Sequence, residues 1–246
     1  MFKDNKLLTL FPSFVGSKRI WIKYLLKYKG MDFIEPFCGS AVVSFNLAKS
    51  CILNDLDPYI YKIINEFDTQ IIPDVFTKDD YLSVRTKNDW WRYVFCLQAM
   101  SFSGVFRYSK NGYNVPVKKN MYSVSLKERF KLSLNRWEKL HIEIHNDTYA
   151  SLSLDKFIDK VVILDPPYQG SKASYNNKSF NYDEYWEWAT KLLPICKVLI
   201  MFDRIKNLED RNIPIYKTRK MRVNGKYDGD IEAMSIYENG GWLYDC

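Results

Sequence analysis

The sequence predicts an α/β protein with a Rossmann-like, doubly wound sheet that is interrupted by an inserted segment. Short apolar runs of the kind found in buried parallel strands alternate with stretches of helical periodicity. Three of the runs stop at polar or Pro- and Gly-containing turns, where ligand groups lie in such sheets. A chain of 246 residues is long enough for one sizeable α/β domain that carries an insertion.

The expected strands of the sheet are apolar and are bounded by turn residues. They lie at residues 31–37, 51–54, 161–164 and 197–202. The expected helices lie at residues 40–47, after Pro58 and at residues 183–193. Near the end of the chain, the β-like runs 214–222 and 231–237 flank Asn224-Gly225 and Asp228-Gly229. Both dipeptides are typical of tight turns, so these runs predict a terminal hairpin.

The stretch from about Phe67 to Trp137 breaks this alternation. It is rich in aromatic and basic residues, and Lys110-Asn111-Gly112 within it is a turn signal. We therefore expect a core domain of residues 1–66 and 141–246, into which residues 67–140 are inserted as a smaller domain. Most of the aromatic residues in the insertion are expected to form its core.

Positive charge is concentrated in the same part of the chain. The formal net charge is +7, and residues 107–140 contain nine Lys or Arg against two Glu. The basic positions are 107, 110, 118, 119, 127, 129, 131, 136 and 139. A polyanion partner, which gains affinity when counterions leave its phosphates, is the favoured interpretation. The alternative is a helix face that is simply solvated.

Features of membrane, secreted and metal-binding proteins are missing from the sequence. No run of eighteen apolar residues occurs, and residues 1–6 do not read as a signal peptide. The five cysteines are scattered, so we expect reduced thiols in a cytoplasmic protein without a membrane partner. His141 and His145 have a spacing that suits a metal on a helix, but their segment alternates like a strand. No metal is therefore expected.

Two of the turns carry groups suited to a small nucleoside-containing ligand. Glu35-Pro36-Phe37-Cys38-Gly39-Ser40 places a glycine directly after a strand, where the backbone can approach a ligand closely. Asp55 ends the next strand, about where a carboxylate accepts hydrogen bonds from ribose hydroxyls. The alternative for Asp55 is to cap the following helix, and Asp57 competes for both roles.

Asp165-Pro166-Pro167-Tyr168 is the most specific turn in the chain. Two consecutive prolines fix the backbone and leave carbonyl oxygens without a neighbouring N–H donor, so these oxygens can accept hydrogen bonds from a ligand amine. Asp165 adds an acidic acceptor, and Tyr168 offers a flat face for a base drawn out of a duplex. The alternative is a structural Pro-Pro turn with a surface tyrosine.

These residues together resemble the Dam-type DNA adenine methyltransferases, and the resemblance covers nearly the whole chain. Phe14-Val15-Gly16-Ser17-Lys18 is similar to the family's aromatic-x-Gly-x-Lys element, and residues 35–40 are similar to its Glu-Pro-Phe-x-Gly turn. Residues 54–57 resemble its acidic motif. Phe106-Arg107-Tyr108, with residues 112–116, is similar to its DNA-reading hairpin, and residues 232–237 resemble its last strand.

The resemblance implies an S-adenosylmethionine-dependent methyltransferase sheet with an inserted target-recognition domain. It implies transfer of the methyl group of S-adenosyl-L-methionine to the amino nitrogen of a flipped adenine in double-stranded DNA, at a GATC-like site. The implied catalytic residues are Asp165, Pro166, Pro167 and Tyr168. The implied cofactor-binding residues are Phe14, Gly16, Lys18, Glu35, Pro36, Phe37, Gly39, Ser40, Asp55 and Asp165. The implied DNA-binding residues are Arg107, Tyr108, Asn114, Lys118 and Lys119.

Two positions depart from the family pattern. Ser40-Ala41-Val42 stands where the family usually has another glycine, and Ser109 stands where Asn is common. Ser109 weakens the transfer of the family's GATC target to this chain, because base specificity depends on a few side chains. The alternatives are an RNA base amino methyltransferase and a catalytically silent nucleic-acid-binding homologue. A monomer is expected, although a dimer is left open. The biological setting is a restriction-modification system, a phage or a regulatory enzyme, and the expected location is the cytoplasm, either free or associated with the nucleoid.

Overall fold

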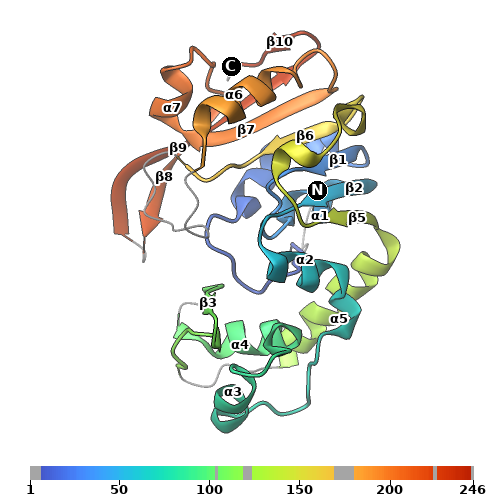
Figure 1. The fold of residues 1–246 in the computed structure, drawn as a ribbon, viewed down its shortest axis with the longest axis vertical. Helices are drawn as coiled ribbons and strands as arrows, with labels where there is room; N and C mark the ends of the chain where they lie inside the picture. Colours follow the sequence, from blue (N-terminus) through green and yellow to red (C-terminus); the bar gives the residue numbers. More distant parts are fainter. Residues whose placement is uncertain (1–6, 103–104, 119–123, 169–179, 224–225, 245–246) are drawn as a thin grey trace. The chain divides into compact units, whose positions relative to one another are not determined.

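A computed structural model describes residues 7–102, 105–118, 124–168, 180–223 and 226–244 of the chain, drawn in Figure 1. The chain divides into two compact units. The first unit comprises residues 1–31 and 38–147, and the second comprises residues 32–37 and 148–246. Helices and a mostly parallel sheet make up the fold, so the predicted α/β class is confirmed.

The second unit contains a mixed sheet with the strand order β10-β9-β7-β6-β1. Its parallel strands are β1 (Asp32–Glu35), β6 (Val161–Leu164) and β7 (Val198–Arg204). Its antiparallel strands are β8 (Lys217–Val223), β9 (Lys226–Glu238) and β10 (Gly241–Trp242), of which β8 and β10 pair with β9. All four residues of β6 are buried, as expected for a central parallel strand. The predicted apolar runs at 161–164 and 197–202 are confirmed as strands.

The tail forms the expected hairpin, with one correction. Strand β8 pairs antiparallel with β9, and Val223 is the register partner of Lys226. The predicted turn at Asn224-Gly225 falls outside the described residues. Asp228-Gly229, predicted as a second turn, instead lies inside β9. The dipeptide lies opposite the register shift between Lys220 and Arg222 of β8, so its local irregularity is accommodated within the strand.

Helices of the second unit follow its strands. Helix α6 (Tyr182–Thr190) begins at Asn181, whose side chain accepts hydrogen bonds from the backbone N–H groups of Asp183 and Glu184. It confirms the helix predicted at 183–193. Helix α7 (Ile205–Glu209) follows β7 directly, and the short 3₁₀ helices η6 (Tyr149–Ser151) and η7 (Leu154–Phe157) precede β6.

In the first unit, β2 (Ser50–Asn54) pairs in parallel with β5 (His141–His145). The predicted strands at 51–54 and through His141 are therefore confirmed. Helix α2 (Pro58–Asn65) has Pro58 in its first turn, as expected. Helix α1 (Val42–Leu47) begins two residues later than predicted, because Ala41 has a left-handed backbone conformation. Other helical elements of this part are η1 (Lys18–Tyr24), η2 (Leu26–Tyr28) and η3 (Phe67–Thr69).

The stretch expected as an insertion lies within the first unit and is mostly helical. Its helices are α3 (Lys78–Val84), η4 (Trp90–Tyr93), α4 (Val94–Met100) and α5 (Val124–Lys139). A small hairpin pairs β3 (Tyr108–Ser109) with β4 (Gly112–Tyr113), which confirms the predicted turn around Asn111. Phe67, Phe95 and Phe130 pack together with ring centroids 5.2–5.7 Å apart, so aromatic residues form the local core. The predicted domain boundaries remain a prediction.

Part of the basic segment has a structural use. On α5, the Arg136 Nε donates to the Phe45 carbonyl oxygen at 2.9 Å, and its Nη2 donates to the Ala48 carbonyl oxygen. These carbonyls lie at the end of α1, where the last carbonyl oxygens of a helix lack partners within the helix. Lys127 of the same helix forms a 2.6 Å ion pair with Asp74. Counting charges therefore overstates how much of this segment serves a polyanion.

Arg136→Met is expected to destabilise the protein by about 1–3 kcal/mol, because two carbonyl oxygens at the end of α1 lose a charged donor. Its affinity for nucleic acid should change little. Lys131→Met, on an exposed part of α5, should change stability little and weaken binding to nucleic acid. Thermal unfolding and filter binding of both variants check this. Unchanged unfolding with weakened binding in Arg136→Met would assign Arg136 to the polyanion surface instead.

Among the described residues, no helix is both long and apolar enough to cross a membrane, and no group of three or more His, Cys, Asp or Glu is arranged to hold a metal. His145 instead contacts Glu143, with 2.7 Å between Nε2 and Oε1.

Candidate active site

In the first unit, a carboxylate joins two of the predicted ligand turns. Asp55 Oδ2 accepts a hydrogen bond from the Gly39 backbone N–H at 2.8 Å, and its Oδ1 accepts one from the Asp57 N–H at 2.9 Å. The backbone carbonyl oxygen of Asp55 also accepts a hydrogen bond from Asn146 Nδ2 at 2.8 Å. The turn after β2 is thus fixed against the glycine turn, as a shared ligand site requires.

The glycine turn depends on left-handed backbone conformations. Gly39 has φ +47°, and a Cβ there would lie 3.0 Å from Cε1 of the Phe14 ring. Two residues on, Ala41 has φ +48° without being a glycine. This is the region where the family pattern has a further glycine, and the backbone adopts a glycine-like conformation at a strain cost of about 1–2 kcal/mol. The chain therefore reaches a left-handed conformation at this point without a second glycine.

The competition between Asp55 and Asp57 for the helix cap is resolved. Asp57 Oδ1 accepts hydrogen bonds from the backbone N–H groups of Tyr59 at 2.8 Å and Ile60 at 3.4 Å, so Asp57 caps α2. Burial raises the pKa of Asp57, while a hydrogen bond from the Tyr108 hydroxyl and the two backbone bonds lower it. Asp55 does not have the capping role.

Phe14 lies in a small group of aromatic rings. Its ring is stacked on that of Phe106 with centroids 5.9 Å apart, and Phe11 contacts both rings at 5.2 and 5.4 Å. Lys18, which is 6% exposed, donates from Nζ to the Gly16 carbonyl oxygen at 2.7 Å. The first unit therefore brings Phe14, Gly39 and Asp55 together around one loop, and Ser40 beside them is buried.

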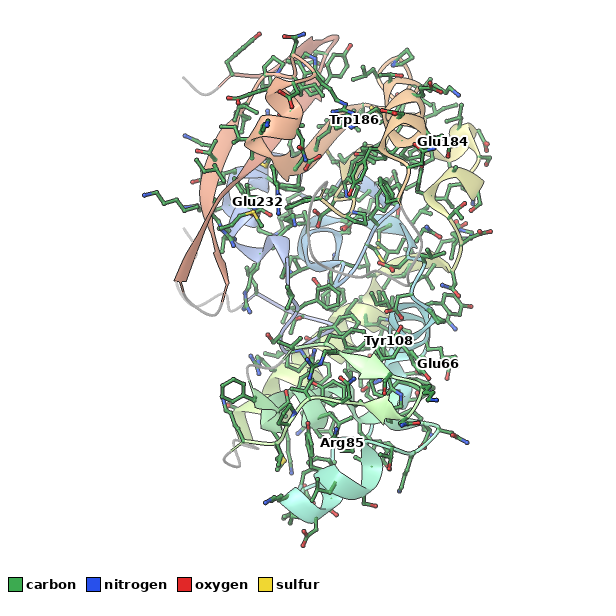
Figure 2. The ribbon with its side chains drawn as sticks, turned by 60° about the vertical axis from the view of Figure 1, so that its left-hand side comes forward. Glu66, Arg85, Tyr108, Glu184, Trp186 and Glu232 are labelled. Carbon is green, nitrogen blue, oxygen red and sulfur yellow. The ribbon has the colours of Figure 1, made fainter. Side chains whose placement is uncertain are left out.

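The predicted DNA-binding residues do not all share one environment. Arg107 is exposed, and its Nε and Nη2 donate to the side-chain and backbone oxygens of Asn114 at 2.9 and 3.0 Å. Lys118 is exposed, and Lys119 falls outside the described residues. Tyr108, in contrast, is half-buried, and Figure 2 shows it on the small hairpin.

The contacts of Tyr108 connect the β3–β4 hairpin to the start of α2 and to η4. Its ring centroid is 4.6 Å from that of Tyr59 and 5.5 Å from that of Trp90. Its hydroxyl donates to Asp57, and burial together with the nearby Asp57 charge raises the pKa of Tyr108 far above its ordinary value. Sequence reasoning missed this link, because nothing local in either segment pairs residues so distant along the chain.

In the second unit, residues at the end of β1 are packed rather than open. Glu35 and Pro36 are buried. The Phe37 ring contacts Tyr149, Phe180 and Tyr185 with centroid distances of 5.1, 5.9 and 5.7 Å. Of the predicted cofactor-binding residues, these three and Asp165 thus belong to the second unit.

The turn Asp165–Tyr168 follows β6 directly and is braced at two points. The Tyr168 hydroxyl donates to Glu232 Oε1 at 2.6 Å, and the Tyr182 hydroxyl donates to the Pro167 carbonyl oxygen at 2.9 Å. One of the proline carbonyls that was expected to be available to a ligand therefore already has a partner. Neither Glu232 nor Tyr182 was among the predicted site residues: Glu232 begins the segment that resembles the family's last strand but had no assigned role, and no motif includes Tyr182.

Three carboxylates act on the Tyr168 hydroxyl. Burial, followed by the charges of Asp165, Glu232 and Asp203, raises the pKa of Tyr168 well above 10. Asp203 is the next-to-last residue of β7 and is itself buried, and burial raises its pKa despite hydrogen bonds from Asn207 and the Arg204 backbone. The phenol consequently keeps its proton at physiological pH, and its hydroxyl donates to Glu232.

Comparison with solved structures finds several chains that align with most of this one, and comparison with curated proteins finds no match in sequence. A conserved hypothetical protein from Streptococcus pyogenes aligns with a TM-score of 0.40 and 11% identity over 94% of this chain and 100% of that one. A putative RNA methyltransferase from Pyrococcus horikoshii aligns with a TM-score of 0.39 and 12% identity, over 96% of this chain and 89% of that one. A dimethyladenosine transferase from Plasmodium falciparum aligns with a TM-score of 0.38 and 14% identity, over 87% of this chain and 58% of that one.

A family model supplies the identification. The model describes the D12 class N6 adenine-specific DNA methyltransferases and matches residues 14–203, well over half of the chain. The matched segment begins at Phe14, includes the Gly39 and Asp55 loop and the Asp165–Tyr168 turn, and ends at Asp203. The chain therefore belongs to the D12 class N6 adenine-specific DNA methyltransferase family.

Proposed function

We propose that this methyltransferase transfers a methyl group to the exocyclic amino nitrogen of adenine in duplex DNA, in the manner of the Dam-type enzymes. The observation that carries the proposal is the Asp165–Tyr168 turn, held at the end of β6 by Tyr182 and Glu232. An acidic acceptor, a rigid Pro-Pro backbone and an oriented aromatic face together fit a planar base with an amino group.

The family implies S-adenosylmethionine as the cofactor, and the first unit contains groups that fit it. The Asp55 carboxylate suits the ribose hydroxyls, the Phe14 face suits the adenine or sulfonium part, and the left-handed Gly39 lets the backbone come close. We assign the same role to Gly16, Lys18 and Ser40, and to Glu35, Pro36 and Phe37 of the second unit. When bound, the cofactor supplies an already activated methyl group.

Asp55→Ala is expected to weaken binding of S-adenosylmethionine by about ten- to a hundredfold, the usual cost of losing hydrogen bonds to a charged acceptor. Calorimetric titration in the absence of DNA measures this without requiring turnover. Asp57→Asn is the matched control, since asparagine also caps helices well and should leave the affinity near that of the wild type. Equal affinities in the two variants would remove Asp55 from the cofactor site.

The remaining chemistry falls to residues of the turn. Asp165 and the Pro166 carbonyl oxygen accept hydrogen bonds from the target amino group, which raises electron density on its nitrogen as it attacks. Tyr168 stacks on the adenine after it leaves the duplex. Holding the amine in line with the methyl group is the main contribution of the protein, because the reaction requires no covalent enzyme intermediate.

We assign DNA contact to the insertion at 67–140. Arg107, whose guanidinium is oriented by Asn114, is suited to bases or to the backbone near the target, and Lys118 and Lys119 are suited to phosphates. Tyr108 is assigned to the same surface. A GATC-like site follows from the Dam-type resemblance, and a monomer acting in the cytoplasm is sufficient for one flipped base.

The test is methyl transfer from labelled S-adenosylmethionine to unmethylated duplex DNA, followed by nucleoside analysis and mapping of the modified positions. N6-methyladenine at a short fixed sequence supports the proposal and supplies the target. A methylated product in structured RNA but not in DNA would show that the substrate is RNA rather than DNA. Absence of both products from a protein that binds the cofactor would contradict the activity, and absence of cofactor binding would indicate a silent homologue.

A further inference from the structure

The hydroxyl of Tyr168 belongs to a three-residue chain that the assigned chemistry does not use. It donates to Glu232 Oε1 at 2.6 Å, and the other oxygen of that carboxylate, Oε2, lies 3.8 Å from Arg219 Nε. Glu232 is 4% exposed, although charged residues are seldom buried without partners. Figure 2 shows Glu232 on the β9 strand.

The chain is anchored in regular structure. Glu232 on β9 is the direct register partner of Arg219 on β8 and of Arg204 on β7. Its backbone is therefore held by strands on both sides, and its buried carboxylate is held between Tyr168 and Arg219. Tyr182 holds the same turn at the Pro167 carbonyl oxygen, so the turn is fixed both through its backbone and through its aromatic side chain.

A tyrosine tied in this way can offer a ligand only part of its chemistry. The hydroxyl proton is committed to a buried carboxylate, and a charge-assisted hydrogen bond of this length is stronger than one to a neutral group. What remains for a ligand is the face of the ring, at a fixed angle. A ring face stacks on any base, so it does not discriminate between bases by hydrogen bonding.

We propose that Glu232 is a positioning residue for the target base, which acts by fixing the plane of the Tyr168 ring, with Arg219 supporting the carboxylate. This inference rests on the proposed function. It assigns base stacking to Tyr168 and the selection of the amino group to Asp165 and its neighbouring carbonyl oxygens, so that loss of the Tyr168 hydroxyl impairs alignment without changing which base is chosen.

Tyr168→Phe tests the inference with the smallest change, because it keeps the ring and deletes only the hydroxyl. We expect kcat to fall by roughly ten- to a hundredfold, as small misplacements of reacting groups do, with cofactor affinity unchanged. Glu232→Ala should cause a similar loss, and Glu232→Gln, which retains an acceptor oxygen, should recover most of it. The double variant Tyr168→Phe with Glu232→Ala should be no slower than either single variant.

A fluorescence readout separates positioning from mere stability. Duplex DNA with 2-aminopurine at the mapped target position reports stacking of the displaced base, and Tyr168→Phe and Glu232→Ala should both change its emission in the complex. Ser235→Ala is the matched control: this buried serine of β9 donates to the Pro214 carbonyl oxygen at 2.6 Å, and its odd spacing from Glu232 places it on the opposite face of the strand. It should lower thermal stability and leave the 2-aminopurine emission as in the wild type.

The outcomes distinguish this inference from the proposed function. A wild-type protein that does not methylate DNA contradicts the proposed function and removes the basis of the inference with it. A wild-type protein that methylates DNA, combined with full kcat in Tyr168→Phe, overturns only the role of Glu232. Additive losses in the double variant would also overturn it. If Glu232→Ala fails to fold, Tyr168→Phe and Glu232→Gln decide the matter without it.

Discussion

Asp165→Ala is expected to abolish detectable methyl transfer, with kcat reduced by roughly 10³-fold or more. In the proposed reaction, this carboxylate both orients the target amine and stabilises the positive charge that develops on its nitrogen, and electrostatic groups of this kind contribute on that scale. Steady-state transfer of labelled methyl groups to the mapped duplex measures the loss, and unchanged thermal unfolding shows that the loss is chemical.

Two further variants make the Asp165 result specific. Asp165→Asn retains one acceptor oxygen and should keep measurably more activity than Asp165→Ala. Asp183→Ala removes an exposed carboxylate at the start of α6 in the same unit and should leave kcat as in the wild type. Full activity in Asp165→Ala would remove the residue from the reaction and, with it, the interpretation of the Asp165–Tyr168 turn.

Gly112→Ala is expected to have the largest effect on stability, with a loss of more than about 2–3 kcal/mol. Gly112 has φ +95°, and a Cβ there would lie 2.2 Å from the Arg85 carbonyl oxygen. That oxygen also accepts the Tyr113 N–H at 2.8 Å, while Arg85 Nε donates to the Tyr113 carbonyl oxygen at 2.9 Å. The methyl group would therefore separate the hairpin from the end of α3.

Displacing the hairpin should also weaken DNA binding, because the proposed DNA-contact residues Arg107, Tyr108 and Asn114 lie on it or next to it. Thermal unfolding and the dissociation constant for duplex DNA measure the two effects together. Gly240→Ala is the matched control, because Gly240 has a similar φ of +80° but open space around its Cβ. It should cost only the backbone strain, about 1–2 kcal/mol. Equal losses in the two variants would show that contact with Arg85 is unimportant.

The strands of the sheet could be predicted from the sequence because their signals are local. Val161 to Leu164 is a run of four apolar residues that ends at a proline pair, and all four are buried in a strand of the same bounds. Pro58 likewise marked the start of α2. Asp228-Gly229 shows where such reasoning fails: the dipeptide lies inside β9, opposite the point where the register with β8 shifts between Lys220 and Arg222.

The candidate site could be predicted only in part, because its supporting contacts are long-range. Gly39, Asp55 and Asp165 follow strands and could be found from that position alone. The acceptor of the Tyr168 hydroxyl is a glutamate far along the chain on β9, and only the pairing of the strands places it there. The basic segment had the same limitation: Arg136 looks like a phosphate ligand in sequence and binds backbone carbonyls in the structure.

The pairing of β1 with β6 has a consequence for synthesis on the ribosome. Phe33 emerges long before its register partner Val161, a delay of roughly ten seconds at typical elongation rates. During that interval the nascent chain carries an apolar strand with no partner on that edge, which is the kind of segment that chaperones bind. Fragments that start at residue 148 would meet the reverse difficulty, because β6 would then expose an unpaired apolar edge and invite aggregation.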